Sequence, residues 1–235
     1  MKLSSTRLYC FSPPVMMATF LIEIGLMIWV LVRYRHTLLV RLVATMMFAL
    51  AVFQLAEYNV CEAAMGLDSV SWARIGFVAI TALPPLGIHI LTVIAKRPMK
   101  WLVVSSYAVM VAFMVLFAFM ERGVTSGVCG GNYVIIDILP QASWWYGFYY
   151  YGLEILAVLL AVWLSRRMID RHAKHALHGM IMAYLVLLVP TTTVNLLYPY
   201  TVQAIPSIMC GFAVFTALII SLYVLPRAQI TKHPR

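Results

Sequence analysis

The sequence predicts an all-α membrane protein, a seven-transmembrane helix bundle with its N-terminus outside and its C-terminus in the cytoplasm. Two observations lead to this fold class. Of the 235 residues, 63% are hydrophobic and only 11% are charged, and the mean hydropathy is +0.92. Soluble domains have about 25% charged residues. The apolar residues also form seven long runs, so we expect one transmembrane domain over residues 1–235 and no second domain.

Each apolar run is bounded by charges, prolines or glycines. At ~1.5 Å per residue, each is long enough to cross most or all of a hydrocarbon core of about 30 Å. The first run ends at Val32 without a small-residue cleavage site, so we interpret it as a helix and not as a signal peptide. Seven spans put the two termini on opposite sides. The predicted spans are Val15–Val32, Thr37–Val60, Ser71–Ala95, Trp101–Met120, Trp144–Leu164, Leu177–Leu197 and Ala204–Leu225.

The basic residues predict the orientation. Most of the 17 lysines and arginines fall in the loops that lie inside when the N-terminus is outside, as the positive-inside rule requires. All six tryptophans lie near predicted interfaces, which supports the span boundaries. The net charge of +9 comes from short clusters between apolar runs. This pattern indicates contact with anionic lipid headgroups and not with nucleic acid, and we predict a bacterial inner (plasma) membrane location.

Prolines interrupt two of the spans. Pro84 and Pro85 lie inside the third span, and Pro190 lies inside the sixth. Each removes a backbone donor and frees a carbonyl group, which lipid cannot satisfy. We therefore expect structural kinks at these prolines and neighbouring helices packed around them.

Polar residues gather in the predicted outer half of the bundle. Gln54 and Glu57 lie three residues apart on one helical face, and Arg74 lies at a matching depth in the next span. A Glu57–Arg74 ion pair would stabilise both charges. One interpretation is an outward-facing ligand pocket, over which Asp137 closes; the other is hydrogen bonding between helices, with threonines capping the carbonyls freed by Pro190. The candidate ligand-binding residues are Gln54, Glu57, Arg74, Thr191, Thr192 and Asn195.

Two intramembrane carboxylates, Glu23 and Glu154, lie near mid-membrane and are expected to be protonated or paired. They could share a proton or bind a cation if their helices face one another, or each could bond to a neighbouring helix. His89, deeper in the third span, is expected to be a satisfied interior histidine. The run His172, His175 and His178 turns around its helix and is expected to be a solvated basic segment, so we predict no metal site.

Four cysteines show no metal or redox spacing. Cys61 and Cys129 both fall in outer connections and could form a disulfide, although Cys10 is a possible partner for either. Cys210 is expected to be a thiol in the core. We find no catalytic motif, and the last span has no lysine to hold retinal. We therefore predict no catalytic residues and no cofactor, and do not expect an enzyme.

Parts of four spans resemble the seven-transmembrane N-terminal sensor region of bacterial histidine kinases. The similarity lies in QLAEY at Gln54–Tyr58, ARIGFVAITALPPLGIHI, LVPTTTVNLLYP and AIPSIMCGFAVFTALIISLYVLPR, over residues 40–227. It implies the same N-out, C-in topology, with matching positions at Glu57, Pro84, Pro85, Pro190 and Pro206. Only ten residues follow Leu225, so we expect no kinase domain, and any signal would need a separate signalling partner.

The sequence thus favours a stand-alone membrane receptor or sensor that binds a small or lipid-like ligand from the outer side and acts in signal transduction. The main alternative is a small proton-coupled transporter that uses Glu23 and Glu154. A membrane subunit of a larger complex is a third possibility.

Overall fold

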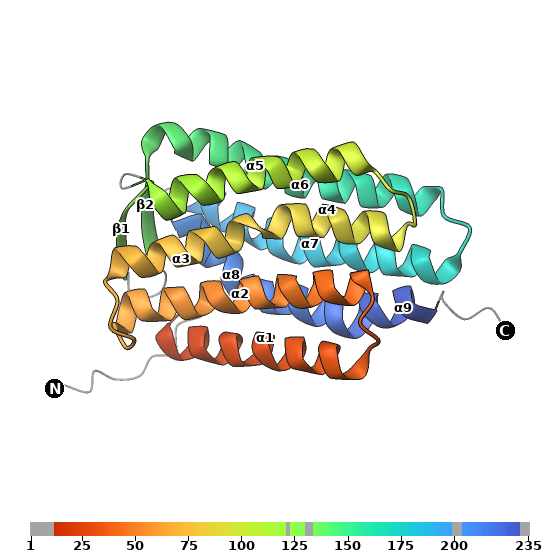
Figure 1. Ribbon diagram of the computed structural model, residues 1–235, viewed down its shortest axis with the longest axis horizontal. Helices are drawn as coiled ribbons and strands as arrows, with labels where there is room; N and C mark the ends of the chain where they lie inside the picture. Colours follow the sequence, from red (N-terminus) through yellow and green to blue (C-terminus); the bar gives the residue numbers. More distant parts are fainter. Residues whose placement is uncertain (1–11, 121–122, 130–133, 199–203, 231–235) are drawn as a thin grey trace.

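The computed structural model describes residues 12–120, 123–129, 134–198 and 204–230. Within these ranges, seven helical segments are long and apolar enough to cross a membrane, as the sequence predicted. A two-stranded hairpin lies between the fourth and fifth segments (Figure 1). The elements are α1 (Pro13–Arg33), α2 (Leu38–Glu62), α3 (Ser69–Thr81), α4 (Leu83–Ile94), α5 (Lys100–Phe119), β1 (Val124–Cys129), β2 (Val134–Ile138), α6 (Pro140–Arg166), α7 (Arg171–Leu197), α8 (Ile205–Leu218), the π-helical segment η2 (Ile219–Val224) and α9 (Leu225–Ile230).

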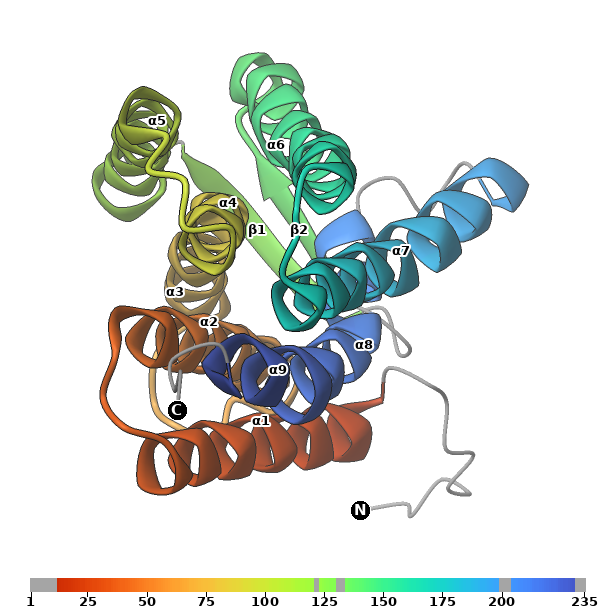
Figure 2. The same cartoon turned by 90° about the vertical axis from the view of Figure 1, so that its right-hand side faces the viewer.

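The helices form a bundle with a central layer and two outer groups. In the end-on view of Figure 2, α1, α2 and α8–α9 lie on one side, α5 and α6 on the other, and α3–α4 and α7 between them. The second and third spans are the most buried, whereas the first and fourth expose most of their apolar side chains. In a bilayer this exposed apolar surface faces lipid tails.

The third span is two helices and not one bent helix. It breaks at Ala82, and Pro84 and Pro85 occupy the first turn of α4, where their missing N–H groups are tolerated. Proline still leaves the carbonyls of the preceding turn without helical donors. The carbonyl of Thr81 receives a hydrogen bond of 2.7 Å from the hydroxyl of Tyr149 on α6. The kink expected here is therefore a helix break, and a neighbouring helix satisfies it.

Pro190, by contrast, lies within α7, which continues through it. The threonines beside it bond back to their own helix. Thr191 donates to the carbonyl of Leu187, and Thr193 donates to that of Val189, each at 2.8 Å. Each is a bond to the carbonyl four residues earlier in the helix. Neither acceptor is the carbonyl of Val186, which Pro190 leaves without its helical donor, so these bonds are not the caps that the sequence suggested.

The long connection after α5 forms the antiparallel hairpin β1–β2. A disulfide joins Cys129 of β1 to Cys61 of α2, which is the pairing that the sequence left open. Its rival partner Cys10 lies outside the described residues. The backbone N–H of Val134 on β2 donates to the hydroxyl of Ser207 on α8 at 3.1 Å. The hairpin is thus attached to two spans at one end of the bundle, which we call the hairpin end.

The last span changes its helical type. After α8, the chain continues as η2 and then as α9, which reaches the end of the bundle opposite the hairpin (Figure 1). Gly179 of α7 packs against η2, and a Cβ atom there would lie only 2.7 Å from the Tyr223 ring and 2.8 Å from Val224. Glycine is therefore needed for the close approach of α7 to η2.

Candidate functional site

A large cleft lies at the hairpin end of the bundle. Its volume is about 890 Å³, and its walls come from α3, the hairpin, α6 and α8. Ligand sites are typically 300–1,000 Å³, mostly apolar, with a few polar groups. The cleft fits this description, since its described lining consists of Phe77, Ile80, Thr125, Ile136, Asp137, Ile138, Pro140, Ser143, Trp144, Tyr146, Gly147, Phe148, Tyr150, Tyr151, Ile205, Pro206, Met209 and Cys210.

A smaller inner cavity lies deeper in the bundle, between α2, α4, α6, α7, α8 and η2. Its volume is about 40 Å³. Tyr150, Met209 and Cys210 line both this cavity and the cleft. The inner cavity therefore adjoins the cleft on the side of the middle of the bundle, with these three side chains between the two spaces.

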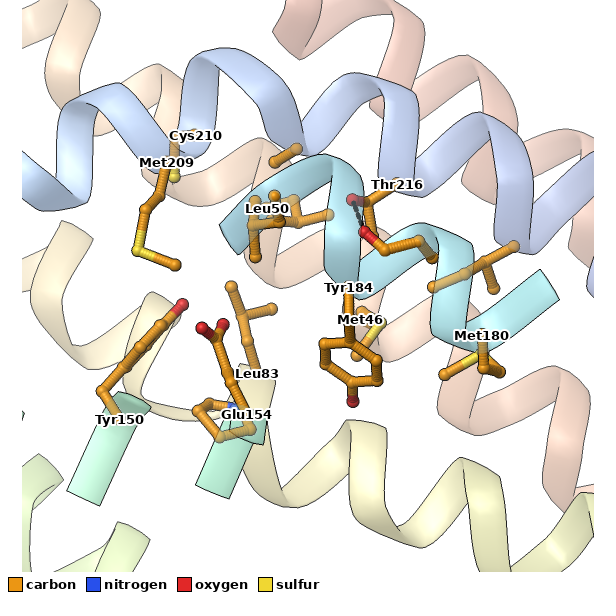
Figure 3. A pocket seen from close by; sticks show the side chains of 15 residues that line it. Met46, Leu50, Leu83, Tyr150, Glu154, Met180, Tyr184, Met209, Cys210 and Thr216 are labelled. Carbon is orange, nitrogen blue, oxygen red and sulfur yellow. Dashed lines mark hydrogen bonds between the residues drawn. The ribbon is translucent and has the colours of Figure 1, made fainter. Parts of the chain in front are cut away.

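Two polar side chains of the inner cavity have a buried atom without a hydrogen-bond partner among the described residues. They are Glu154, at its Oε2 atom, and Tyr184, at its hydroxyl. Their side chains are only 2% and 6% exposed. Figure 3 shows the Glu154 carboxyl group beside the Tyr150 hydroxyl and the Met209 side chain. The Tyr184 hydroxyl ends against Gly87, where a Cβ atom would lie only 1.8 Å away.

An aromatic cluster packs α6 against α3 and α5, and two of its members, Phe77 and Tyr146, line the cleft. The ring of Tyr146 packs against Phe77, Phe113 and Phe117, with centroids 5.0–5.5 Å apart. Its hydroxyl lies 3.2 Å from the Thr81 hydroxyl. These contacts hold α6 at a fixed position against α3 and α5.

The predicted ligand residues Gln54 and Glu57 do not line either cavity. They instead hold α8 to α2. The Gln54 Nε2 atom donates to the carbonyl oxygen of Cys210 at 2.8 Å, and the Glu57 side chain shares a hydrogen bond with Ser207. Because α8 forms part of the cleft and of the cavity, both residues position these walls without contacting the space inside.

The remaining predicted ligand residues are also absent from the described linings of the two cavities. The contacts among described residues include no Glu57–Arg74 ion pair. Arg74 is half-buried and interacts with another group of the protein. Thr191 is buried against its own helix, and Thr192 is exposed. Asn195 is half-buried. Asp137 lines the cleft and not a pocket formed by the predicted ligand residues, and its carboxylate accepts a 2.6 Å hydrogen bond from Ser126.

The two mid-membrane carboxylates have different environments. Glu23 of α1 is fully buried, and neither of its oxygens has a hydrogen-bond partner among the described residues. It lines neither cavity, whereas Glu154 lines the inner one. Glu23 and Glu154 are therefore not hydrogen-bonded to each other.

The histidines form no metal site in the described part of the chain. His172, His175 and His178 lie exposed on the first turns of α7, and His89 lies 3.3 Å from the Tyr107 hydroxyl. Across the described ranges, no group of three or more His, Cys, Asp or Glu side chains could hold a metal ion.

Comparisons with protein-family models, with curated protein sequences and with solved structures gave no match. The assignment of the cleft as a candidate binding site is therefore based on its geometry alone.

Sequence reasoning missed the cleft because its walls come from the aromatic start of α6 and from α8. Tyr146, Tyr149, Tyr150 and Tyr151 are closely spaced and fall on more than one face of the helix, so they give no clear facial pattern. The available signal was their density: four tyrosines within six residues of a span are unusual for a surface that faces only lipid tails.

Proposed function

We propose that this protein is an integral membrane receptor that binds a small amphipathic molecule in the cleft at the hairpin end and signals through a separate partner protein. The observation that carries the proposal is the cleft of about 890 Å³ with aromatic walls and few polar groups. The inner cavity beside the cleft is lined by Glu154. A ligand with an apolar body and one polar group would match both parts.

Two features support an outward-facing hairpin end. Most basic side chains of the described residues lie at the opposite ends of the helices, including Arg33 of α1, Lys100 of α5, Arg166 of α6 and Arg227 of α9. Such residues favour the cytoplasmic side. The disulfide lies at the hairpin end, and disulfides persist in oxidising compartments. In a bacterium this would be the periplasmic face of the inner membrane.

The last span offers a route for the signal. Met209 and Cys210 of α8 line the cleft, and the same span continues through η2 to α9 at the other end of the bundle. Short π-helical segments often occur at functional positions because they allow local changes of helix geometry. A ligand that shifts α8 would therefore move α9. The resemblance to histidine kinase sensor regions also favours a signalling role with a separate partner.

A thermal-shift screen of the purified protein against metabolites and lipids would test the cleft as the binding site. Gly147 lines the cleft, and a Cβ atom at this position would meet nothing within 4 Å. The Phe side chain of Gly147→Phe would therefore begin in open space, and we expect it to occupy part of the cleft and abolish stabilisation by the compounds found. Gly152→Phe is the matched control, because Gly152 lies on the same helix, is equally open and lines neither cavity. Compounds that still stabilise Gly147→Phe would exclude the cleft.

A second candidate function is transport, which one observation favours. The inner cavity, which the buried carboxyl group of Glu154 lines, adjoins the cleft at the hairpin end. Glu154, and not Glu23, is thus the residue on which carriage of a proton or substrate would depend. Flux of the screened compounds into proteoliposomes should stop in Glu154→Gln if the protein is a transporter; binding without flux would favour the receptor.

A further inference from the structure

The inner cavity contains a carboxyl group that the protein itself leaves unsatisfied. Glu154 is 2% exposed, and its Oε2 atom has no hydrogen-bond partner among the described residues. A buried carboxyl group without partners costs several kcal/mol in an apolar environment. Glu154 differs from the equally buried Glu23 in that it lines a cavity, so a group that enters this cavity could supply the missing hydrogen-bond donor.

The cavity around Glu154 lies directly beside the cleft. Tyr150, Met209 and Cys210 form its boundary with the cleft and line both spaces. On the cavity side, Glu154 and Tyr150 point toward the same space below Met209 (Figure 3). A molecule in the cleft can therefore present one end to Glu154 when the side chains of Tyr150 and Met209 adjust.

The described lining of the two spaces is acidic and aromatic. Its ionisable acids are Asp137 in the cleft and Glu154 in the cavity, and none of its described residues is Lys, Arg or His. The described lining of the cleft also includes the aromatic side chains of Trp144, Tyr146, Tyr150 and Tyr151. Aromatic faces attract cations, most strongly where water is excluded. Both features repel anions and favour a positively charged ligand.

The size of the inner cavity limits the group that reaches Glu154. The cavity volume of about 40 Å³ has room for roughly three water molecules. This space accommodates an ammonium group with its adjacent carbon, but not a ring. The apolar remainder of such a ligand would stay in the cleft, which is more than large enough.

We infer that the ligand is a small organic amine that places its ammonium group against Glu154 in the inner cavity and leaves its apolar part in the aromatic cleft. This inference rests on the proposed function of the cleft and defines its ligand class. The pairing would stabilise both charges, because an ammonium ion supplies the donors that the carboxylate lacks. It also explains why the bundle maintains a lone carboxyl group at this depth.

The test compares two probes that differ in charge but little in shape. Binding of 2-phenylethylamine and of 2-phenylethanol to the purified full-length protein is measured by isothermal titration calorimetry. The amine should bind at least tenfold more tightly than the alcohol. Equal binding of the two probes, or no measurable binding of the amine, would overturn the inference without the need for any variant.

Variants then locate the charge that selects the amine. Glu154→Gln keeps the side-chain shape and should reduce the amine affinity at least tenfold, with little effect on the alcohol. Glu23→Gln is the matched control, since Glu23 is equally buried but lines neither cavity, and it should leave the amine affinity unchanged. Equal losses in both variants would contradict a specific role for Glu154. Thermal unfolding without ligand shows whether each variant is folded.

The two probes and the Gly147→Phe variant together distinguish a wrong ligand class from a wrong binding site. If Gly147→Phe abolishes binding of the screened compounds but the amine binds no better than the alcohol, the cleft is a binding site for uncharged molecules. In that case only the ligand class is wrong. If Gly147→Phe leaves the binding of all compounds unchanged, the cleft itself is excluded.

Discussion

The hydroxyl of Tyr149 lies 2.7 Å from the carbonyl oxygen of Thr81, which is the carbonyl that Pro85 leaves without a helical donor. The bond joins α6 to the break between α3 and α4. The same α6 segment provides much of the cleft wall. The proline pair of the third span and Tyr149 of α6 therefore act together to fix the position of the cleft wall that α6 provides.

Tyr149→Phe should destabilise the protein by about 1–2 kcal/mol, because the Thr81 carbonyl would be left buried without a donor. Tyr146→Phe is the comparison. It should cost less, since the Thr81 hydroxyl keeps its 2.6 Å bond to the carbonyl of Phe77 when Tyr146 is changed. Unfolding by SDS in mixed micelles measures both. Equal stabilities of Tyr149→Phe and the wild type would contradict the assigned role of the bond.

Pro85→Ala offers a direct check of the same mechanism. Alanine restores a backbone N–H four residues after Thr81, so the helix itself could supply the missing donor. In this background, Tyr149→Phe should cost about 1 kcal/mol less than in the wild type, as measured by a double-mutant cycle. An identical cost in both backgrounds would mean that the Tyr149 bond does not replace the donor lost at Pro85.

Gly87→Ala should destabilise the protein by about 1–3 kcal/mol, since the new Cβ atom would lie 1.8 Å from the Tyr184 hydroxyl. Adding Tyr184→Phe should recover most of this loss, because the next atom of the ring, Cζ, is 3.1 Å away. Gly25→Ala is the control, as a Cβ atom there meets nothing within 4 Å. Thermal unfolding in detergent gives the comparison; a double variant no more stable than Gly87→Ala would contradict the steric explanation.

The disulfide between Cys61 and Cys129 closes a loop with a sequence separation of 68 and attaches the hairpin to α2. Reduction, or replacement of either cysteine by serine, should cost about 2–4 kcal/mol and increase proteolysis of the hairpin. Cys210→Ala should not change the response to reductant, because Cys210 is a free, buried thiol. Insensitivity of the wild type to reductant in both assays would contradict a stabilising disulfide.

Asp68 should make stability depend on pH at the acidic end of the range. It caps the N-terminus of α3, and its carboxylate accepts bonds from the hydroxyl and the backbone N–H of Ser71, which lower the pKa of Asp68. Because the pKa is lower in the folded state, this contribution is complete above the unfolded value of about 4 and is lost as the pH falls through the folded value.

Asp68→Asn retains a capping oxygen but cannot titrate. Its melting temperature should therefore fall less than that of the wild type between pH 5 and pH 2.5, while the two remain similar at pH 7. Parallel curves over the whole range would show that the Asp68 carboxylate makes no pH-dependent contribution to folding.

The sequence alone determined the features of this protein that depend on local patterns. Hydropathy predicted the seven spans, with most bounds within two residues of the observed ones and the start of the sixth span six residues late. Pro84 and Pro85 marked the interruption of the third span, and the outer cysteines suggested the disulfide. Each of these depends on residues close together in the chain or on the side of the membrane where they lie. Burial of apolar runs in lipid is sufficient to specify them.

Only the tertiary structure decided which polar residues face one another and which face a cavity. Glu57 bonds to Ser207, Glu23 lies near Glu57, and Glu154 lines the inner cavity beneath the cleft. The rotation of each helix about its axis sets these relationships. Lipid and the bundle interior are both apolar, so the sequence shows only a weak difference between helix faces, and the packing of the helices determines the site.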